Sequence, residues 1–196
     1  MLKLAVLVSG GGANLQNIID KIEDGYLNCK IVKVIASRKD IYAIERAEKH
    51  NLLSEVISPK NFDNTESFTK AMIKAVKDSG ADLIVLAGYL TVLGEEFAKA
   101  FKNRVINVHP SLIPSFCGKG FYGLKVHTEV LKAGVKVTGA TVHFVDCGVD
   151  TGKIIMQKAV SVLENDTPET LQKRVMEEAE SLILIEVIKL FAKAGA

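Results

Sequence analysis

The sequence contains few cysteines, and their spacing excludes a disulfide scaffold. Its 196 residues include 3 cysteines, Cys29, Cys117 and Cys147, none of them in a C-x-x-C pair. Three cysteines cannot all pair within one chain, and scattered thiols are typical of proteins from a reducing compartment. We therefore expect free thiols and a cytoplasmic protein.

The sequence also lacks a strong net charge and a long apolar run. Its formal net charge is +2 at pH 7, with basic residues scattered among acidic ones, which argues against a nucleic-acid partner. No apolar stretch approaches the roughly 18 residues of a membrane span. The mostly apolar segment 1–8 runs straight into Ser9-Gly10-Gly11-Gly12 without a cleavage-type region. We expect neither a signal peptide nor association with a membrane.

What is present is the composition of a folded domain. Apolar residues make up 48% of the chain and charged residues 24%, which is ordinary for a globular protein. The length and the absence of repeats or a linker predict a single domain over residues 1–196. The sequence leaves both a monomer and a homodimer open.

Two kinds of apolar segment alternate along the first half of the chain. Short apolar runs that predict buried strands lie at 4–8, 31–35, 54–57, 83–86 and 104–107. Apolar residues at helical spacing predict helices at 13–23, 41–50, 65–77 and 95–101. This alternation predicts an α/β fold with βαβ units and a mostly parallel sheet.

The pattern changes after the fifth expected strand. Residues 110–123 contain two prolines and three glycines, which predicts a long and therefore often functional loop. A helix is expected at 124–133, and β-rich runs at 137–145 and 154–162 are close enough to form an antiparallel pair. Thr167-Pro168-Glu169 is a typical helix start, and the last helix is expected to run towards Phe191.

A glycine-rich segment joins the first expected strand to the first helix. Residues 9–16 read Ser-Gly-Gly-Gly-Ala-Asn-Leu-Gln. Glycines let the backbone approach a ligand, and the free N–H groups of a helix start attract an anion, so phosphate is the natural ligand. The segment is not a Walker loop, and it matches G-x-G-x-x-G only at Gly10 and Gly12. A simple tight corner is the alternative interpretation.

Asn107 and His109 follow the short apolar run Val105-Ile106. Residues two apart in an extended segment point the same way, so the two side chains should project together. An amide donor beside an imidazole can stabilise negative charge that develops on a carbonyl oxygen. The alternative is a polar turn at the end of a strand.

Asp150 lies in a glycine-flanked turn after an expected strand. A functional Asp150 would lie beside His109 and raise its pKa, whereas a structural one would cap its own turn. His143 precedes this turn and is as plausible a structural hydrogen-bonding residue as a catalytic one. His143 and Cys147 lack further ligands at zinc spacing, so we expect no metal.

Taken together, the Ser9–Gln16 loop, the Asn-Val-His-Pro-Ser-Leu-Ile-Pro segment from Asn107 and the Asp150-Thr-Gly turn resemble the phosphoribosylglycinamide formyltransferases. The resemblance extends from Leu4 to about Leu190. It implies a three-layer Rossmann-like formyltransferase fold, mostly parallel, with an antiparallel C-terminal strand pair. It also implies transfer of the formyl group of 10-formyltetrahydrofolate to the amine of 5-phosphoribosylglycinamide in purine biosynthesis.

The resemblance assigns roles to particular residues. The catalytic residues would be Asn107, His109 and Asp150. The substrate would be bound by Gly12, Ala13, Asn14, Asn107 and an acid of the last helix, Glu180 or, as a second choice, Glu178. The folate would be bound by Thr65, Tyr89, Leu90, Thr91, Val92, Leu93, Val145, Asp146 and Asp150. Many relatives have a polar residue in place of Ala13, so phosphate binding here would depend more on backbone N–H groups. Many have a basic residue in place of Thr91 and some an arginine in place of Thr65, so the sequence leaves recognition of the folate glutamate tail open.

Two other functions are compatible with parts of the sequence. One is an NADP-dependent oxidoreductase, because Arg38 follows the second expected strand, where an arginine suits the 2′-phosphate of NADP. The other is a regulatory module that binds folate or a nucleotide without catalysis. Neither explains the combination of Asn107, His109 and Asp150.

Overall fold

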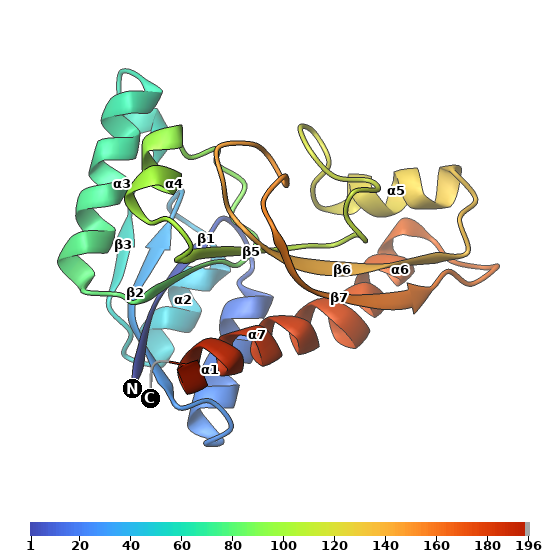
Figure 1. Ribbon diagram of the computed structural model, residues 1–196, viewed down its shortest axis with the longest axis horizontal. Coiled ribbons are helices and arrows are strands. Elements are labelled where there is room, and N and C mark those ends of the chain that lie inside the picture. Colours follow the sequence, from blue (N-terminus) through green and yellow to red (C-terminus); the bar gives the residue numbers. More distant parts are fainter. Residues whose placement is uncertain (195–196) are drawn as a thin grey trace. The chain divides into compact units, whose positions relative to one another are not determined.

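The computed structural model describes residues 1–194, which form two compact units. The first unit contains Met1–Ile106 together with the residues from Ile188 onward, and the second contains Asn107–Val187. Figure 1 labels the helices and strands in chain order.

A largely buried sheet forms the centre of the first unit. Strand β1 (Leu2–Val8) pairs in parallel with β2 (Cys29–Ala36) on one side and with β4 (Leu83–Leu86) on the other. β3 (Ser54–Val56) pairs in parallel with β2, and β5 (Val105–His109), which continues into the second unit, lies next to β4. Residues 4–8 are fully buried, as expected for a strand covered on both faces.

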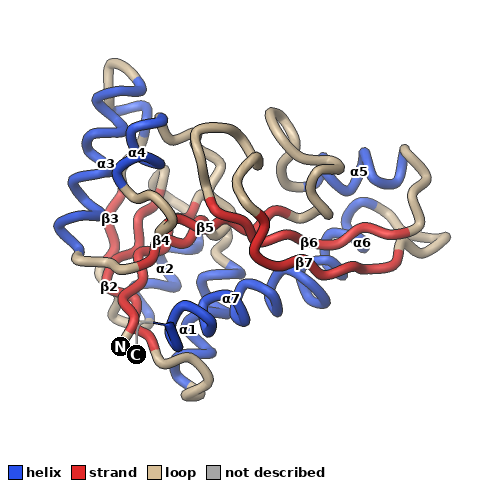
Figure 2. The backbone as a smooth tube through the Cα atoms, viewed as in Figure 1, coloured by secondary structure: helices blue, strands red, loops and turns tan. Residues whose placement is uncertain are grey.

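Helices cover both faces of this sheet. The helices are α1 (Ala13–Glu23), α2 (Tyr42–Lys49), α3 (Thr65–Ser79) and α4 (Glu95–Ala100), with a short 3-10 helix at Pro59–Asn61. In Figure 2, α1 and α2 lie together on one face and α3 and α4 on the other. The chain therefore changes direction across the sheet between β1 and β4, and in such sheets the segments after these two strands form the usual ligand-binding crevice.

The second unit is built on an antiparallel pair. β6 (Val137–Phe144) pairs with β7 (Ile154–Ser161), and β5 lies on the other side of β6. The helices of this unit are α5 (Leu124–Lys132) and α6 (Pro168–Val175), followed by a π-helical turn at Met176–Glu180 and by the start of α7 (Ser181–Ala194). Thr167 and Thr170 cap α6 reciprocally, which explains why the helix begins there.

The fold class predicted from the sequence is confirmed, and each expected strand and helix is present within a few residues of its predicted bounds. Two features were not predicted. β5 extends to His109, whereas the expected strand ended at residue 107, so His109 lies within the strand and not beyond it. The last helical segment contains a π turn in place of one continuous α-helix.

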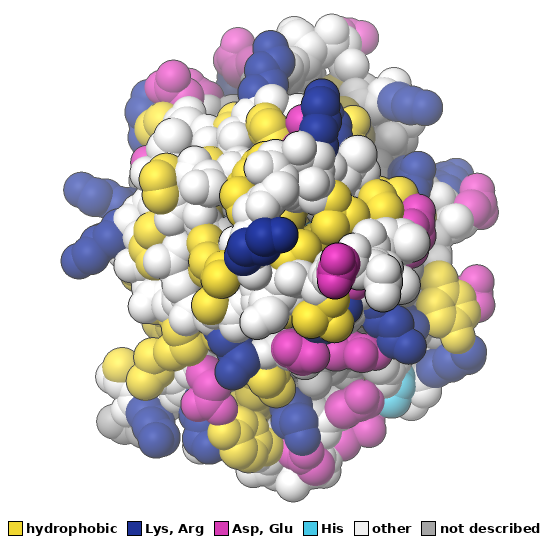
Figure 3. All heavy atoms as spheres, turned by 90° about the vertical axis from the view of Figure 1, so that its right-hand side faces the viewer, with side chains coloured by type: hydrophobic (Ala, Val, Ile, Leu, Met, Phe, Trp, Pro, Cys, Tyr) yellow, Lys and Arg dark blue, Asp and Glu magenta, His cyan; other side chains and the backbone are white. Residues whose placement is uncertain are grey.

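The distribution of charged side chains on the surface and the apolar character of the helices can be compared with the composition of the sequence. On the face shown in Figure 3, basic and acidic side chains are intermixed. Among residues 1–194, no helix combines the length and the apolar character that a membrane span requires.

Candidate active site

Four polar side chains of the second unit meet beside the end of β5. Asn107 and His109 are two residues apart on this strand, so they lie on the same side of it. Nδ1 of His109 is 3.4 Å from Oδ2 of Asp150, and Nδ2 of Asn107 is 3.5 Å from Oδ1 of the same carboxylate. The structure therefore brings together the three residues that the sequence predicted as catalytic.

His143 is the fourth member of this cluster. Its Nε2 lies 3.2 Å from Nδ2 of Asn107 and 3.5 Å from Oδ1 of Asp150. Its Nδ1 faces the carbonyl oxygen of Phe144 at 2.8 Å, which assigns a proton to Nδ1. Strand alternation placed His143 on the less apolar face of β6, but the side chain is only 2% exposed because β6 is buried on both faces. The burial of this side chain was not predicted from the sequence.

The turn after β6 contains two acids with different contacts. Oδ1 of Asp146 accepts hydrogen bonds from the N–H of Gly148 at 3.0 Å and from Oγ1 of Thr151 at 2.6 Å, so Asp146 is the Asx-turn residue. Asp150 instead directs its carboxylate towards His109 and has a left-handed backbone with φ of 57°. The turn-capping role considered for Asp150 belongs to Asp146.

The loop after β5 also contacts the cluster. The N–H of Gly118 donates to Oδ2 of Asp150 at 2.9 Å, and the carbonyl oxygen of Phe116 lies 3.0 Å from Nε2 of His109. Because that carbonyl can only accept, Nε2 of His109 bears a proton. Both ring nitrogens of His109 thus already face an oxygen atom. A ligand oxygen can reach Nε2 only by replacing the Phe116 carbonyl.

Burial and charge act in opposite directions on this cluster. Burial lowers the pKa of His109 below its ordinary value, and Asp150 and the Phe116 carbonyl, which both raise it, offset only part of that effect. The sequence predicted that Asp150 raises this pKa, and Asp150 does so, but burial, which the sequence does not reveal, has the larger effect. Burial raises the pKa of Asp150, but His143, His109 and the N–H of Gly118 together bring it below its ordinary value. The carboxylate is therefore charged near neutral pH.

In the first unit, the predicted phosphate site is a loop of free backbone donors between β1 and α1. We call Gly10–Gly12 the anion loop. Within residues 1–194, the N–H groups of these three glycines donate no hydrogen bond. Beside the loop, Asn14 is 5% exposed, and its Oδ1 has no hydrogen-bond partner among the described residues. Unpaired N–H groups before a helix form a typical anion-binding site.

The three glycines of the anion loop differ in what they tolerate. Gly12 has φ of 72°, and a Cβ atom there would lie 2.8 Å from Cβ of Ala43 on α2. Gly12 is therefore required by the backbone and by the packing of α1 against α2. A Cβ atom at Gly10 or Gly11 would meet nothing within 4 Å. These two positions face open space, as a ligand site requires.

The predicted folate-binding residues lie in both units. Leu90, Thr91, Val92 and Leu93 follow β4 in a loop, where Leu90 is 58% and Val92 68% exposed. Tyr89 is buried, with its hydroxyl 3.9 Å from Sδ of Met72, so its side chain anchors the loop to α3. Thr65 is exposed at the start of α3. Val145 and Asp146 belong to the turn after β6 in the second unit.

The π turn distinguishes the two candidate acids of the last helical segment. Glu180 ends the turn and is 5% exposed, whereas Glu178 is exposed. A π turn inserts one residue relative to an α-helix and is frequent at functional sites. Of the two acids, Glu180 is the one whose side chain is buried.

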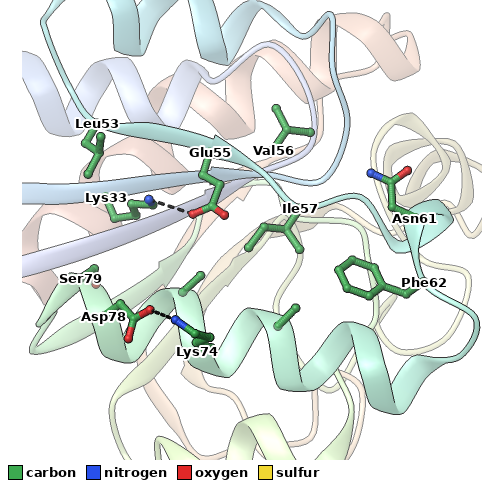
Figure 4. Close-up of a pocket in the computed structure, with 12 residues that line it drawn as sticks. Lys33, Leu53, Glu55, Val56, Ile57, Asn61, Phe62, Lys74, Asp78 and Ser79 are labelled. Carbon is green, nitrogen blue, oxygen red and sulfur yellow. Dashed lines mark hydrogen bonds and ion pairs between the residues drawn. The ribbon is translucent and has the colours of Figure 1, made fainter.

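A pocket of about 360 Å³ in the first unit lies apart from these residues. It is lined by side chains of β2, β3 and α3, and ion pairs between Lys33 and Glu55 and between Lys74 and Asp78 lie at its edge (Figure 4). None of the predicted site residues lines it. Residues 1–194 contain no group of three or more His, Cys, Asp or Glu side chains that could bind a metal ion.

Comparisons with known proteins agree with this geometry. The sequence profile described as formyl transferase matches residues 2–188. A chloroplastic phosphoribosylglycinamide formyltransferase of Arabidopsis thaliana is 40% identical over 95% of this chain and 64% of its own length. The chain therefore spans less than two thirds of that plant relative.

Two bacterial proteins are similar over most of their own length. A phosphoribosylglycinamide formyltransferase of Bacillus subtilis is 37% identical over 89% of this chain and 87% of its own. The crystal structure of glycinamide ribonucleotide transformylase 1 from Symbiobacterium toebii superimposes with a TM-score of 0.92 at 41% identity. That superposition covers 99% of this chain and 89% of the other.

Proposed function

The chain belongs to the formyl transferase family, and we propose that it transfers the formyl group of 10-formyltetrahydrofolate to the amine of 5-phosphoribosylglycinamide in purine biosynthesis. The observation that carries the proposal is the cluster of Asn107, His109, His143 and Asp150. It combines donors for a developing oxyanion with a charged carboxylate, which is the equipment that acyl transfer to an amine requires.

The proposed reaction begins when the neutral glycinamide amine attacks the formyl carbon. The carbonyl oxygen then gains negative charge, and N–H groups of Asn107 and His109 stabilise it. The formyl oxygen takes the place of the Phe116 carbonyl at Nε2 of His109. The C–N bond to the folate then breaks, so the products are tetrahydrofolate and formylated phosphoribosylglycinamide.

Asp150 has two roles in this mechanism. Its carboxylate lies close to Nδ1 of His109 and raises the pKa of that ring against the opposing effect of burial. It therefore stabilises the imidazolium as the oxyanion forms. Through a bound water molecule, it also transfers the proton that the attacking amine loses towards the nitrogen of the leaving folate, so the proton count balances.

Substrate binding is proposed at three places. The substrate phosphate binds the free N–H groups of the anion loop and its neighbours Ala13 and Asn14. Glu180 binds the ribose hydroxyl groups. The folate is bound by residues that each unit contributes: Thr65 and 89–93 in the first, Val145, Asp146 and Asp150 in the second.

The oxidoreductase alternative is not favoured. The Nε–H of Arg38 donates to the carbonyl oxygen of Ser9 at 3.2 Å, which gives this arginine a role within the glycine-rich segment itself. A regulatory module would not require the buried cluster around Asp150. We further propose a cytoplasmic protein, monomeric or homodimeric, whose partners are small molecules.

Replacing Asp150 tests the proposal. Asp150→Asn is expected to lower kcat at least a hundredfold, because one oriented electrostatic partner contributes about 3 kcal/mol to such a transition state. Formyl transfer from 10-formyltetrahydrofolate to phosphoribosylglycinamide is followed by the absorbance of the folate product.

Asp166→Asn is the matched control. Asp166 is an ion-paired carboxylate of the same unit, bound to Arg174, but it lies outside the cluster. It should leave kcat within a few fold of the wild type. Equal loss in both variants, or normal turnover of Asp150→Asn, would show that Asp150 has no special role in the reaction.

A further inference from the structure

Three successive carbonyl groups of the anion loop and its flank are held from one side. The carbonyl oxygen of Ser9 accepts from Nε of Arg38 at 3.2 Å, and that of Gly10 from the N–H of Ala43 at 3.3 Å. The carbonyl oxygen of Gly11 accepts from Nε of Arg46 at 2.9 Å. All three donors belong to residues 38–46, which contain the end of the β2–α2 connection and most of α2.

Peptide planarity converts these contacts into a direction for the loop donors. In a trans peptide, the C=O of one residue and the N–H of the next point in opposite directions. Fixing the carbonyls of Ser9, Gly10 and Gly11 therefore turns the N–H groups of Gly10, Gly11 and Gly12 away from residues 38–46. In a regular strand these groups would alternate in direction, whereas here all three are oriented by the same segment. The result is a nest of free N–H donors.

Arg46 is built to hold its carbonyl in one geometry. Its Nη1 donates to Oε1 of Gln16 at 2.9 Å, and its guanidinium lies 4.6 Å from the centre of the Tyr42 ring. Gln16 in turn donates to Asp20 at 2.8 Å. The planar guanidinium of an arginine can donate to Gly11 and to Gln16 at the same time. A lysine has a single side-chain nitrogen at a different distance from the backbone and cannot reproduce both hydrogen bonds.

We propose that Arg46 and, to a lesser degree, Arg38 are positioning residues for the substrate phosphate, acting through the carbonyls of Gly11 and Ser9 to orient the N–H groups of the anion loop. This inference rests on the proposed function for the identity of the phosphate-bearing substrate. It does not depend on formyl transfer for its test, because phosphate binding is measurable separately.

The experiment compares Arg46→Met, Arg46→Lys and Arg38→Met with the wild type. Arg46→Met keeps the apolar stem over Tyr42 but removes both donors. It should raise KM for phosphoribosylglycinamide at least tenfold and leave KM for the formyl donor within twofold. Its kcat/KM for the dephosphorylated substrate should be unchanged, since only the phosphate uses the loop. Arg38→Met should raise the same KM by a smaller factor. A general structural defect would instead also raise KM for the formyl donor and lower kcat/KM for the dephosphorylated substrate. That result would overturn the proposal.

Arg104→Met is the matched control. Arg104 likewise donates to backbone carbonyls, to Asp82 at 2.9 Å and to Ala81, and lies 5.8 Å from the centre of the Phe101 ring. It belongs to the same unit but not to the loop, so KM for phosphoribosylglycinamide should stay within twofold. An equal increase in this control would overturn the positioning role of Arg46.

Arg46→Lys keeps the charge, and its KM for phosphoribosylglycinamide should stay at least threefold above that of the wild type. A KM equal to that of the wild type would mean that charge alone matters, which would overturn the positioning role.

Binding of ribose 5-phosphate separates this inference from the proposed function. Titration with ribose 5-phosphate should shift the amide resonances of Gly10–Gly12 in the wild type. The affinity should fall at least tenfold in Arg46→Met, while the Arg104→Met affinity is retained. If the wild type binds ribose 5-phosphate at this loop but does not transfer a formyl group, the proposed function is wrong and the positioning role stands. If the wild-type amides do not respond, the positioning role is wrong even where formyl transfer is observed.

Discussion

At the residue scale, the chemistry of the proposed site depends on the surroundings of His109, whose ring nitrogens face the carboxylate of Asp150 and the carbonyl oxygen of Phe116. Strand spacing and a glycine-flanked turn predicted Asn107, His109 and Asp150 as candidates, because both are local patterns. Strand alternation could not place His143, because both faces of β6 are buried, and no side-chain pattern marks the backbone carbonyl of Phe116. The pKa of His109 also depends on burial, which only the assembled unit defines.

The titration of His109 tests the electrostatic part of the mechanism. Its pKa in the wild type should lie below the ordinary value of 6.5, because burial outweighs the favourable contacts. Asp150→Asn should lower this pKa further, since the negative charge near Nδ1 is lost while the ring stays in place. NMR of the ring resonances in both proteins measures the change. An unchanged pKa would show that Asp150 does not act on His109.

The anion loop offers a second prediction about single residues. Gly12→Ala should lower the free energy of unfolding, by about 1 kcal/mol or more for the left-handed backbone alone, and its Cβ would also contact Ala43. Gly11→Val should fold normally, because a Cβ at Gly11 meets nothing within 4 Å, but should raise KM for phosphoribosylglycinamide. Urea unfolding and steady-state kinetics of the two variants separate these effects. Normal KM in a folded Gly11→Val protein would place the phosphate elsewhere.

At the scale of helices and strands, the sequence predicted which segments form helices and which form strands. It did not predict irregular geometry within a helix. Helices such as α1 and strands such as β4 match their predicted bounds because apolar spacing and burial agree there. The π turn at Met176–Glu180 was not foreseen, because its residues are compatible with an α-helix. Its position depends on packing that buries both Ala179 and Glu180.

Helix α5 contains a buried histidine that should make stability depend on pH. His127 is fully buried, neither ring nitrogen has a partner among the described residues, and burial lowers its pKa to about 4. The unfolded chain, with an ordinary pKa near 6.5, binds this proton more readily. The contribution of the neutral His127 ring to stability is therefore complete above about pH 6.5 and is lost as the pH falls towards 4. At pH 5 the free energy of unfolding should be lower by about 2 kcal/mol.

Urea unfolding at pH 7 and pH 5 checks this expectation. His127→Leu should reduce the loss of stability between the two pH values by about 2 kcal/mol. If the wild type and His127→Leu lose equal stability, His127 is not the group that titrates.

At the scale of the whole molecule, the two units divide the proposed work. The first contains the anion loop, with its N–H groups oriented by residues 38–46, and the second contains the buried cluster around Asp150. The sequence predicted the anion loop and three of the four cluster residues as candidates, because these belong to local motifs. It did not predict the carbonyl contacts of Arg38 and Arg46, since nothing in a single arginine indicates which backbone group it will bind.

The most direct test of the account follows one labelled carbon. The wild-type protein is mixed with phosphoribosylglycinamide and 10-formyltetrahydrofolate that carries a ¹³C-formyl group, and the products are analysed by mass spectrometry. We expect one labelled formyl group on the glycinamide amine for each tetrahydrofolate released, over many turnovers and without added metal. Release of labelled formate with unmodified glycinamide, or no release at all, would contradict it.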